Sequence, residues 1–369
     1  MPRHLLRRAA GRLRRVVTGT PAALPEPAPL PVLGYVVAGA DGAHPASAHV
    51  RVVRRTEHLG RTGGAVVRQV DPAAFVDGRD ETDYAALLVQ RDVLPRDLVA
   101  PFLAAARARG IRVAAEVDDD FFTASGRDRL ARAEYDPDRL ASIDALVRGA
   151  DLVVVSTEEL AGVVRPVARR VVVVPNALDP TIWTPGATAT DDDRPADEHR
   201  VLYMGTLTHG ADLALLRDVF TDLTDADGVP IRLEVIGVTD DADGSDWYRR
   251  LEVPDGHYPA FARWLVDHRQ RWRAGVAPLR DEEFNRAKSD LKAVEYTALG
   301  LPAVVSDRPS YRAAREHGVI AVPDDTAAWR DAVRAAVASG AADPDAAEWV
   351  RTERVIGLDG DTWRSVLLG

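Results

Sequence analysis

Short, continuous apolar runs alternate with helical stretches along most of this chain, and that alternation constrains its fold more than any other feature. Strands buried on both faces are continuously apolar, whereas strands with one wet face alternate apolar and polar residues. The runs before residue 176 include LGYVVAG (33–39), GAVVRQV (64–70), DYAALLVQR (83–91), IRVAAEVD (111–118), DLVVVS (151–156) and RVVVVP (170–175). This pattern predicts a parallel sheet with helices on both faces, a doubly wound α/β domain.

The same pattern starts again after a break. The stretch 187–200 carries acidic residues, Thr and Pro without apolar periodicity, and further strand-like runs follow at 200–205, 231–237 and 301–306. A chain of 369 residues also exceeds the usual size of one core. We therefore expect two Rossmann-like domains. The expected parts are a basic tail and Pro-rich linker over 1–31, an N-terminal domain over 32–185, a linker over 186–199 and a C-terminal domain over 200–369.

Composition excludes several classes of function. A net charge of −10 with dispersed basic residues argues against nucleic-acid binding. The absence of cysteine excludes disulfides, thiolate catalysis and Cys-ligated zinc. No apolar run approaches the roughly 18 residues that span a bilayer. These features predict a cytoplasmic protein. Six arginines within the first fifteen residues are consistent either with a helix lying on anionic lipid at the inner face of the membrane or with a simple basic tail.

Two doubly wound domains commonly hold a ligand between the carboxyl ends of their sheets, so any chemistry is expected in strand-to-helix turns. The stretch KSDLKAVEYTALG (288–300) contains the only two lysines of the chain, Lys288 and Lys292, among 47 basic residues. In a helix these lysines share one face with Glu295.

Two cations at the start of a helix repel each other and oppose the helix dipole. An anion such as a diphosphate would remove that conflict, and Glu295 could then accept hydrogen bonds from sugar or ribose hydroxyls. The alternative is a solvated helix whose lysines pair with Asp290 and Glu295.

Two further turns carry polar residues. In MGTLTHGADL (204–213) the residues Gly205, Thr206, Thr208 and His209 join a strand to a helix. His209 either donates a hydrogen bond to a phosphate or is an exposed turn residue.

In EVDDDFF (116–122), Asp118 and Asp120 follow a strand. One of them could orient an acceptor hydroxyl or accept its proton, the pair could bind Mg²⁺, or both could serve only the turn. The three interpretations remain open at this point.

The run FNRAKSDLKAVEYTALGLPAVVSD (284–307) resembles the donor-binding region of GT-B-fold glycosyltransferases, closest to the retaining group 1 or family 4 enzymes. The resemblance implies that Glu295 contacts the nucleotide ribose. The family usually has a second glutamate eight positions earlier, where this chain has Ala287, so the chain looks like a KSDLK-type variant. The residues expected to bind the donor are Gly205, Thr206, His209, Lys288, Ser289, Asp290, Leu291, Lys292 and Glu295, with Asp118 or Asp120 as catalytic residue.

The function implied by this resemblance is transfer of a sugar, of hexosyl type, from a nucleotide-diphosphate sugar to a glycan, a lipid-linked acceptor or another acceptor of the bacterial cell envelope. Retention of anomeric configuration without a metal is expected, with the nucleotide sugar as donor substrate and no further cofactor. The absent glutamate at position 287 favours the alternative, a non-catalytic nucleotide-sugar or glycan-binding protein of the same fold.

Overall fold

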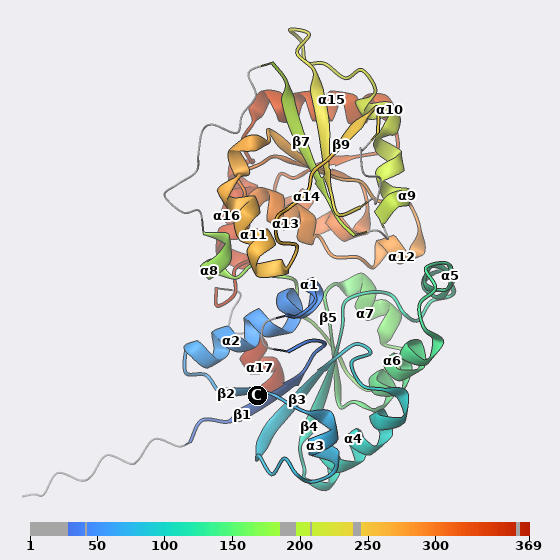
Figure 1. Ribbon diagram of the computed structural model, residues 1–369, viewed down its shortest axis with the longest axis vertical. Helices are drawn as coiled ribbons and strands as arrows, with labels where there is room; N and C mark the ends of the chain where they lie inside the picture. The colour runs from blue at the N-terminus through green and yellow to red at the C-terminus, as the bar shows by residue number, and fades with distance from the viewer. Residues whose placement is uncertain (1–28, 41–42, 185–196, 207–208, 239–244, 359–361) are drawn as a thin grey trace, which may run out of the picture. The chain divides into compact units, whose positions relative to one another are not determined.

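The computed structural model describes residues 29–40, 43–184, 197–206, 209–238, 245–358 and 362–369. Residues Pro31–Gly369 form one compact unit that contains two six-stranded sheets, whose strands pair in parallel throughout (Figure 1). The prediction of two doubly wound α/β domains is confirmed.

The first sheet has the order β2-β1-β3-β4-β5-β6. Its strands are β1 (Val32–Val36), β2 (Val66–Gln69), β3 (Tyr84–Gln90), β4 (Arg112–Val117), β5 (Leu152–Val155) and β6 (Val171–Val173). The second sheet has the order β12-β11-β10-β7-β8-β9. Its strands are β7 (His199–Met204), β8 (Ile231–Ile236), β9 (Tyr248–Arg250), β10 (Ala274–Ala277), β11 (Ala303–Ser306) and β12 (Ile320–Val322).

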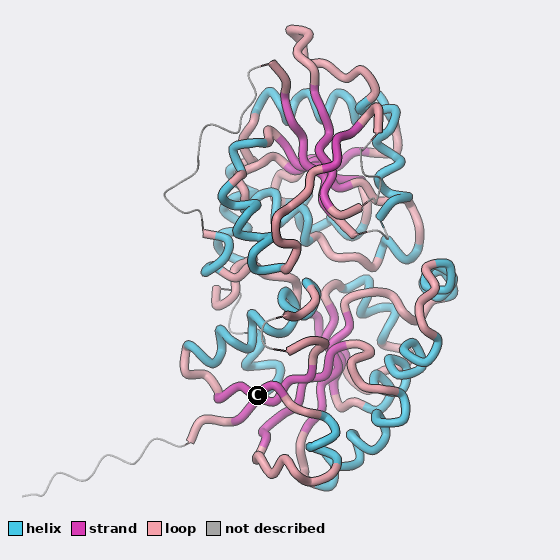
Figure 2. Tube along the Cα trace, viewed as in Figure 1, coloured by secondary structure: helices cyan, strands magenta, loops and turns pink. Residues whose placement is uncertain are grey.

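Helices cover both faces of the first sheet, which lies between them in Figure 2. One face packs on α3 (Pro72–Val76), α4 (Arg96–Ala108), α6 (Pro137–Gly149) and α7 (Glu158–Val164). The other face packs on α1 (Ala46–Ala48), the π-helical turn η1 (His49–Val53), α2 (Arg54–Arg61) and the C-terminal helix α17 (Thr362–Leu368). Helix α5 (Ala124–Arg132) follows β4, and α8 (Pro180–Trp183) follows the last strand of this sheet.

The second sheet is enclosed in the same way. One face packs on α11 (Tyr258–Asp267), α13 (Leu291–Ala298), α14 (Arg312–Glu316) and α16 (Pro344–Glu353). The opposite face packs on α9 (Gly210–Leu213), η4 (Ala214–Leu216), α10 (Arg217–Phe220) and α15 (Thr326–Ser339). The remaining short helices are η5 (Arg269–Arg271), α12 (Glu283–Arg286) and η6 (Pro309–Tyr311).

Local sequence signals explain where several helices begin and end. Helix α6 begins at Pro137, since Asp136 accepts the backbone N–H of Asp138 and Pro137 occupies the first helical position. Helix α4 is followed by Gly110 at a φ of 68°, a left-handed conformation that glycine adopts without steric cost. Helix α13 begins at Leu291, so Lys292 lies within the helix and Lys288 lies just ahead of it.

The predicted domain bounds stay a prediction, and the structure adds a crossing between the two halves. Helix α17 carries Trp363 and Leu367 into the core of the first sheet, and Arg112 donates a hydrogen bond to the carbonyl of Gly369 at 3.0 Å. Val50 of η1 belongs in turn to the core around α11 and α13, while Ala287 packs into the core of the first sheet. Among the described residues, no helix combines the length and apolar character needed to cross a membrane.

Candidate functional site

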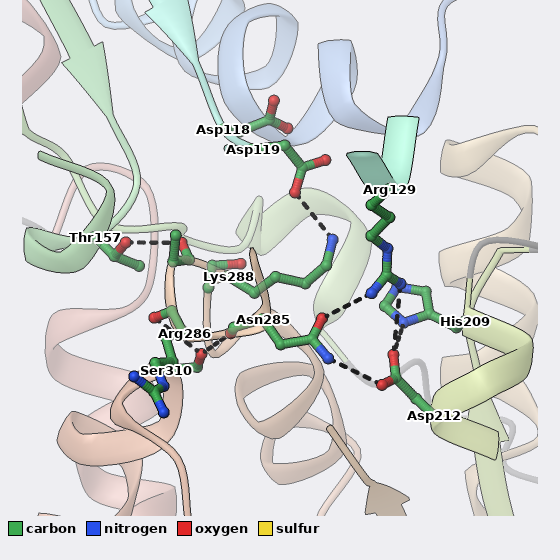
Figure 3. Close-up of polar contacts among 12 residues, drawn as sticks. Asp118, Asp119, Arg129, Thr157, His209, Asp212, Asn285, Arg286, Lys288 and Ser310 are labelled. Atoms are coloured by element: carbon green, nitrogen blue, oxygen red, sulfur yellow. Dashed lines mark hydrogen bonds and ion pairs between the residues drawn. The ribbon is translucent and has the colours of Figure 1, made fainter. Parts of the chain in front are cut away.

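Three segments that follow strands of the two sheets meet through their side chains (Figure 3). They are the aspartate turn after β4, the turn between β7 and α9, and the segment from α12 to α13. Parallel sheets bind ligands at the carboxyl ends of their strands, because the loops that follow adjacent strands converge there. The predicted turns are thus brought to one place.

Lys288 contacts the other domain directly. Its Nζ lies 2.9 Å from Oδ1 of Asp119, an ion pair in which both side chains are partly exposed (Figure 3). The ammonium also lies 4.7 Å from the centre of the Phe284 ring. Burial alone would raise the pKa of Asp119, but Lys288 and Arg91 outweigh it and hold that pKa below its usual value. The anion now opposite Lys288 is therefore a carboxylate of the protein itself.

Lys292 lies in the first turn of α13 and has no carboxylate partner among the described residues. Its Nζ is 3.4 Å from Nε2 of His209 and 5.6 Å from the centre of the Tyr203 ring. Burial, and then the charge of Lys288, lowers the pKa of Lys292 to about 8. Neither contact supplies a negative charge, and Asp212, Glu295 and Asp119 act on the ammonium only from beyond ion-pair distance.

Glu295, one turn further along α13, is buried with 7% of its surface exposed. Within the described part of the chain its carboxyl group has no hydrogen-bond partner, and burial raises its pKa to about 8. The carboxyl oxygens are not among the fully enclosed side-chain atoms that lack a partner, so they keep some exposure through which a ligand hydroxyl could reach them. The nearby Tyr258 has its pKa raised by burial and by the charge of Glu295.

Ser289 and Asp290 turn away from the lysines. Nδ2 of Asn176 donates to Oγ of Ser289 at 2.8 Å, and the guanidinium of Arg354 donates to both oxygens of Asp290 at 2.6 Å. Leu291 packs against the core beside α13. These side chains fasten the segment to the rest of the protein, and donor contacts from Ser289, Asp290 and Leu291 stay a prediction.

The turn between β7 and α9 places Gly205 against His209. A Cβ on Gly205 would lie 3.3 Å from Cδ2 of the His209 ring, so the absence of a side chain lets that ring approach closely. Thr206 is exposed, and Thr208 lies outside the described residues. His209 is mostly buried, with Nδ1 at 2.9 Å from Oδ2 of Asp212. Burial, and then Lys292, lowers the pKa of His209 to about 4, so its ring is neutral at pH 7.

The three consecutive aspartates after β4 have different surroundings. Asp118 forms a short ion pair with Arg91, whose φ of 45° is left-handed. Asp120 is buried and accepts the backbone N–H groups of Phe122 and Thr123 at 3.0 Å, as turn residues commonly do. Asp119, which lies between them, reaches Lys288.

A catalytic role for Asp118 or Asp120 stays a prediction. Of these two carboxylates, that of Asp120 already accepts hydrogen bonds from the backbone of its own turn. Among the described side chains, no group of three or more His, Cys, Asp or Glu is arranged to hold a metal ion.

Sequence reasoning missed several members of this cluster. Arg129 of α5 extends to the second domain, where its NH1 lies 3.4 Å from Oδ1 of Asn285 (Figure 3). The same nitrogen lies 3.4 Å from Oε2 of Glu282. Its guanidinium lies 4.6 Å from the centre of the Phe284 ring. Nothing in the spacing of the arginines distinguishes Arg129 from its neighbours. The position of Asp119 also could not be inferred, because three adjacent acids give no indication of which one points outward.

A cavity of about 710 Å³ lies elsewhere, beside the first turns of α4 and α6. Its lining consists of Asp92, Val93, Leu94, Pro95, Arg96, Asp97, Asp136, Asp138, Arg139 and Ser142. None of these residues belongs to the three converging segments. We assign the candidate site to the converging segments, because charged side chains of both domains meet there and burial displaces the pKa values of His209, Lys292 and Glu295.

Comparison with known proteins gives results at the level of fold. No protein-family model and no curated protein matches the sequence. Anabaena HepE in complex with UDP-glucose superposes with a TM-score of 0.60 at 10% identity, over 91% of this chain and 98% of that one.

An α-glucosyltransferase in complex with UDP-glucose and DNA gives a TM-score of 0.57 at 9% identity, over 91% and 98% of the two chains. A Listeria monocytogenes chain assigned as a UDP-N-acetylglucosamine 2-epimerase gives 0.50 at 10% identity, over 92% and 95%. With two parallel Rossmann-like domains arranged as in these structures, the chain has the GT-B fold of nucleotide-sugar glycosyltransferases.

Proposed function

We propose that this protein is a glycosyltransferase that moves a sugar from a nucleotide-diphosphate sugar to a glycan, lipid-linked or other cell-envelope acceptor. The observation that carries the proposal is the environment of α13. Lys292 has no anionic partner, and the buried carboxyl of Glu295 has no hydrogen-bond partner among the described residues. A diphosphate beside the lysines would give Lys292 a negative partner, and ribose hydroxyls would donate hydrogen bonds to Glu295.

The charges also fit the chemical step. When the bond between sugar and diphosphate breaks, negative charge grows on the leaving phosphate oxygens, and positioned cations stabilise that charge most at this moment. Lys288 and Lys292 are the cations placed for this role. Asp119 of the first domain is paired with Lys288, which makes it a candidate, beside Asp118 and Asp120, for orienting an acceptor hydroxyl.

Retention of configuration and independence of metal are part of the proposal and rest on the resemblance of 284–307 to the family 4 enzymes. This chain has Ala287 where the family has its first glutamate, so the donor-sugar contact of that glutamate is absent. Ala287 instead packs in the first-domain core, and its carbonyl accepts a hydrogen bond from the hydroxyl of Thr157 at 3.0 Å. Other groups must then hold the sugar.

The packing of Ala287 also favours the second candidate, a protein that binds nucleotide sugars without transferring them. One experiment separates the two. Purified protein is incubated with a panel of nucleotide sugars, with and without EDTA, and slow release of nucleoside diphosphate is followed. Hydrolysis or transfer supports the enzyme, whereas saturable binding with no turnover under any condition supports the binding protein.

The same reactions resolve two further points. Because one solved neighbour is assigned as a 2-epimerase, each sugar is also analysed for inversion at C2, an outcome that would contradict transfer. With an acceptor found, the coupling constant of the anomeric proton in the product shows whether configuration is retained.

A further inference from the structure

Asp212 is held as an anion by hydrogen bonds from several directions. It is fully buried at α9 and accepts Nδ1 of His209 at 2.9 Å, Nδ2 of Asn285 at 3.0 Å and the backbone N–H of Arg280 at 3.0 Å. Arg129 of the first domain adds its charge at 3.9 Å. Burial alone would raise the pKa of Asp212, but the bonds from His209 and Arg280 outweigh it and lower the pKa.

This arrangement fixes the tautomer of His209. A carboxylate only accepts, so the ring nitrogen that contacts Asp212 must carry the hydrogen, and in the neutral ring Nε2 is then an acceptor. Lys292, whose Nζ lies 3.4 Å from Nε2, only donates. The single consistent direction is therefore Lys292 to His209 to Asp212. The distance is long for a hydrogen bond, so the attraction between ammonium and ring lone pair is mainly that of an ion and a dipole.

The sequence interpretation of His209 as a direct phosphate donor does not agree with this geometry, since Nε2 carries no hydrogen in this tautomer. Gly205 leaves room for the ring, and Tyr203 lies beneath the ammonium at 5.6 Å. With one N–H directed to His209, the remaining hydrogens of Lys292 are free for another acceptor. We propose that Asp212 and His209 are positioning residues that aim the Lys292 ammonium at the diphosphate of the donor. This inference rests on the proposed function.

The chain offers a direct test, because it contains only two lysines. Protein labelled with ¹⁵N-lysine gives two side-chain signals, and Lys288→Arg assigns them. His209→Phe keeps a ring of similar size but removes the acceptor, whereas His209→Gln retains an acceptor oxygen. The arrangement in which Asp212 orients His209 and His209 orients Lys292, here called the relay, predicts that the Lys292 signal moves in His209→Phe. In His209→Gln this signal should stay near its wild-type position, and the Lys288 signal should change little in either variant.

Inorganic pyrophosphate is the binding probe, since it presents a diphosphate without a base or sugar. We expect His209→Phe to weaken its binding roughly tenfold, the usual effect of one charged hydrogen bond, and His209→Gln to restore most of the affinity. Asp212→Asn should reverse the tautomer, which ¹⁵N signals of the imidazole report. His209→Phe keeps the test valid if Asp212→Asn fails to fold.

Two failures can be told apart. If pyrophosphate shifts the Lys292 signal in the wild type and binds equally well to His209→Phe, the relay is wrong while the donor site stands. If pyrophosphate and UDP shift neither lysine signal in the wild type, the donor site is wrong and the relay has no function to serve. An Nε2–H tautomer in the wild type would overturn the relay by itself.

Discussion

The carboxyl ends of the strands in the first and second sheets, here the first and second edges, differ in how their buried charges are partnered. At the first edge, Glu116 is fully buried, yet it accepts Nε of Arg51 at 2.7 Å and Nε2 of Gln90 at 2.9 Å. At the second edge, Lys292 faces a neutral ring and Glu295 lacks a hydrogen-bond partner within the described residues. Burial raises the pKa of both Glu116 and Glu295, so the two edges differ in partners: Glu116 has a cation and an amide bonded to it, whereas Glu295 has no hydrogen bond from the described residues.

This difference indicates what each edge is for. Buried charges with partners hold parts of a fold together. Removing one partner leaves the other charge buried without compensation, which destabilises the fold. Charges with displaced pKa values and no partner within the protein mark places where the fold has accepted a cost, as binding and catalytic sites commonly do. We therefore expect removal of charge to destabilise the first edge and to affect ligand binding, with little loss of stability, at the second.

The largest effect is expected from Arg51→Met. Arg51 is almost fully buried and also donates at 2.8 Å to the carbonyl of Val174 and to Oδ1 of Asn176, so its loss leaves Glu116 buried without its cation. The free energy of unfolding should fall by about 3–5 kcal/mol, as when other buried pairs lose one member. Urea unfolding followed by circular dichroism measures the change.

Arg148→Met is the matched control. It removes an exposed arginine of the same domain, paired with the partly exposed Asp144 one helical turn away, and it should leave the urea midpoint nearly unchanged. A similar loss of stability in both variants would contradict the view that the first edge depends on its buried pair.

The next largest effect is expected at the second edge, on binding. Lys292→Met and Lys288→Met should each weaken UDP binding about 10- to 100-fold, because a charge-assisted contact to phosphate contributes about 1.5–3 kcal/mol. Stability should change little, since the Lys288–Asp119 pair is partly exposed and the contact from Lys292 to His209 is long. Isothermal calorimetry measures affinity, and urea unfolding of the same samples measures stability.

Arg286→Met serves as the control for the lysines. Arg286 is exposed, pairs with Asp281 at 2.9 Å and stands only two positions before Lys288. Its removal changes the net charge equally and should leave UDP affinity near the wild-type value. An equal loss of UDP affinity in all three variants would show that the lysines act only through the overall charge of the protein and do not contact the phosphates.

Glu295→Gln is expected to stabilise the protein in a pH-dependent manner. The pKa of Glu295 is raised from 4.5 to about 8, so the contribution of its protonated form is complete below pH 4.5 and is lost as pH rises toward and through 8. Glutamine has no such loss. Relative to the wild type, the variant should gain stability between pH 5 and pH 8, by about 1–3 kcal/mol at the upper end.

Urea unfolding at pH 5 and pH 8 tests this sign. Gln90→Met at the first edge provides the contrast, since it removes a hydrogen bond to Glu116 and should destabilise the protein at both pH values. A gain from Glu295→Gln that is the same at pH 5 and pH 8 would show that titration of the carboxyl group is not its cause.

The sequence predicted both sheets and the segment that carries the lysines of the second edge. Continuous apolar runs predicted both parallel sheets, and the placement of two lysines in a chain rich in arginine singled out the segment before α13. The runs describe backbone and burial, which local sequence controls. They do not describe which distant residue meets a given side chain, and this is why the partners were missed.

Asp290 illustrates that limit. Its position before a helix predicts a cap or a lysine partner, but Arg354, 64 residues later, binds both of its oxygens. Arg51 is a similar case, because the Gly-containing stretch around residues 39–52 does not indicate a helix, and its partner Glu116 lies 65 residues away. Long-range ion pairs depend on how α16 and η1 pack, and that arrangement exists only in the folded chain.

The smallest expected effect concerns the contact where the two edges meet. Lys288 is paired with Asp119, so a diphosphate that binds this lysine must compete with a carboxylate already present. Asp119→Asn removes the competitor and should tighten UDP binding, roughly threefold for a partly exposed pair. Asp118→Asn makes the same change of charge one residue away, but Asp118 pairs with Arg91 and has no contact with Lys288. If UDP affinity rises only in Asp119→Asn, the competition is a direct one at Lys288. If it rises equally in both variants, the acidic first edge acts through its overall field, and the ion pair between the domains has no special part in donor binding.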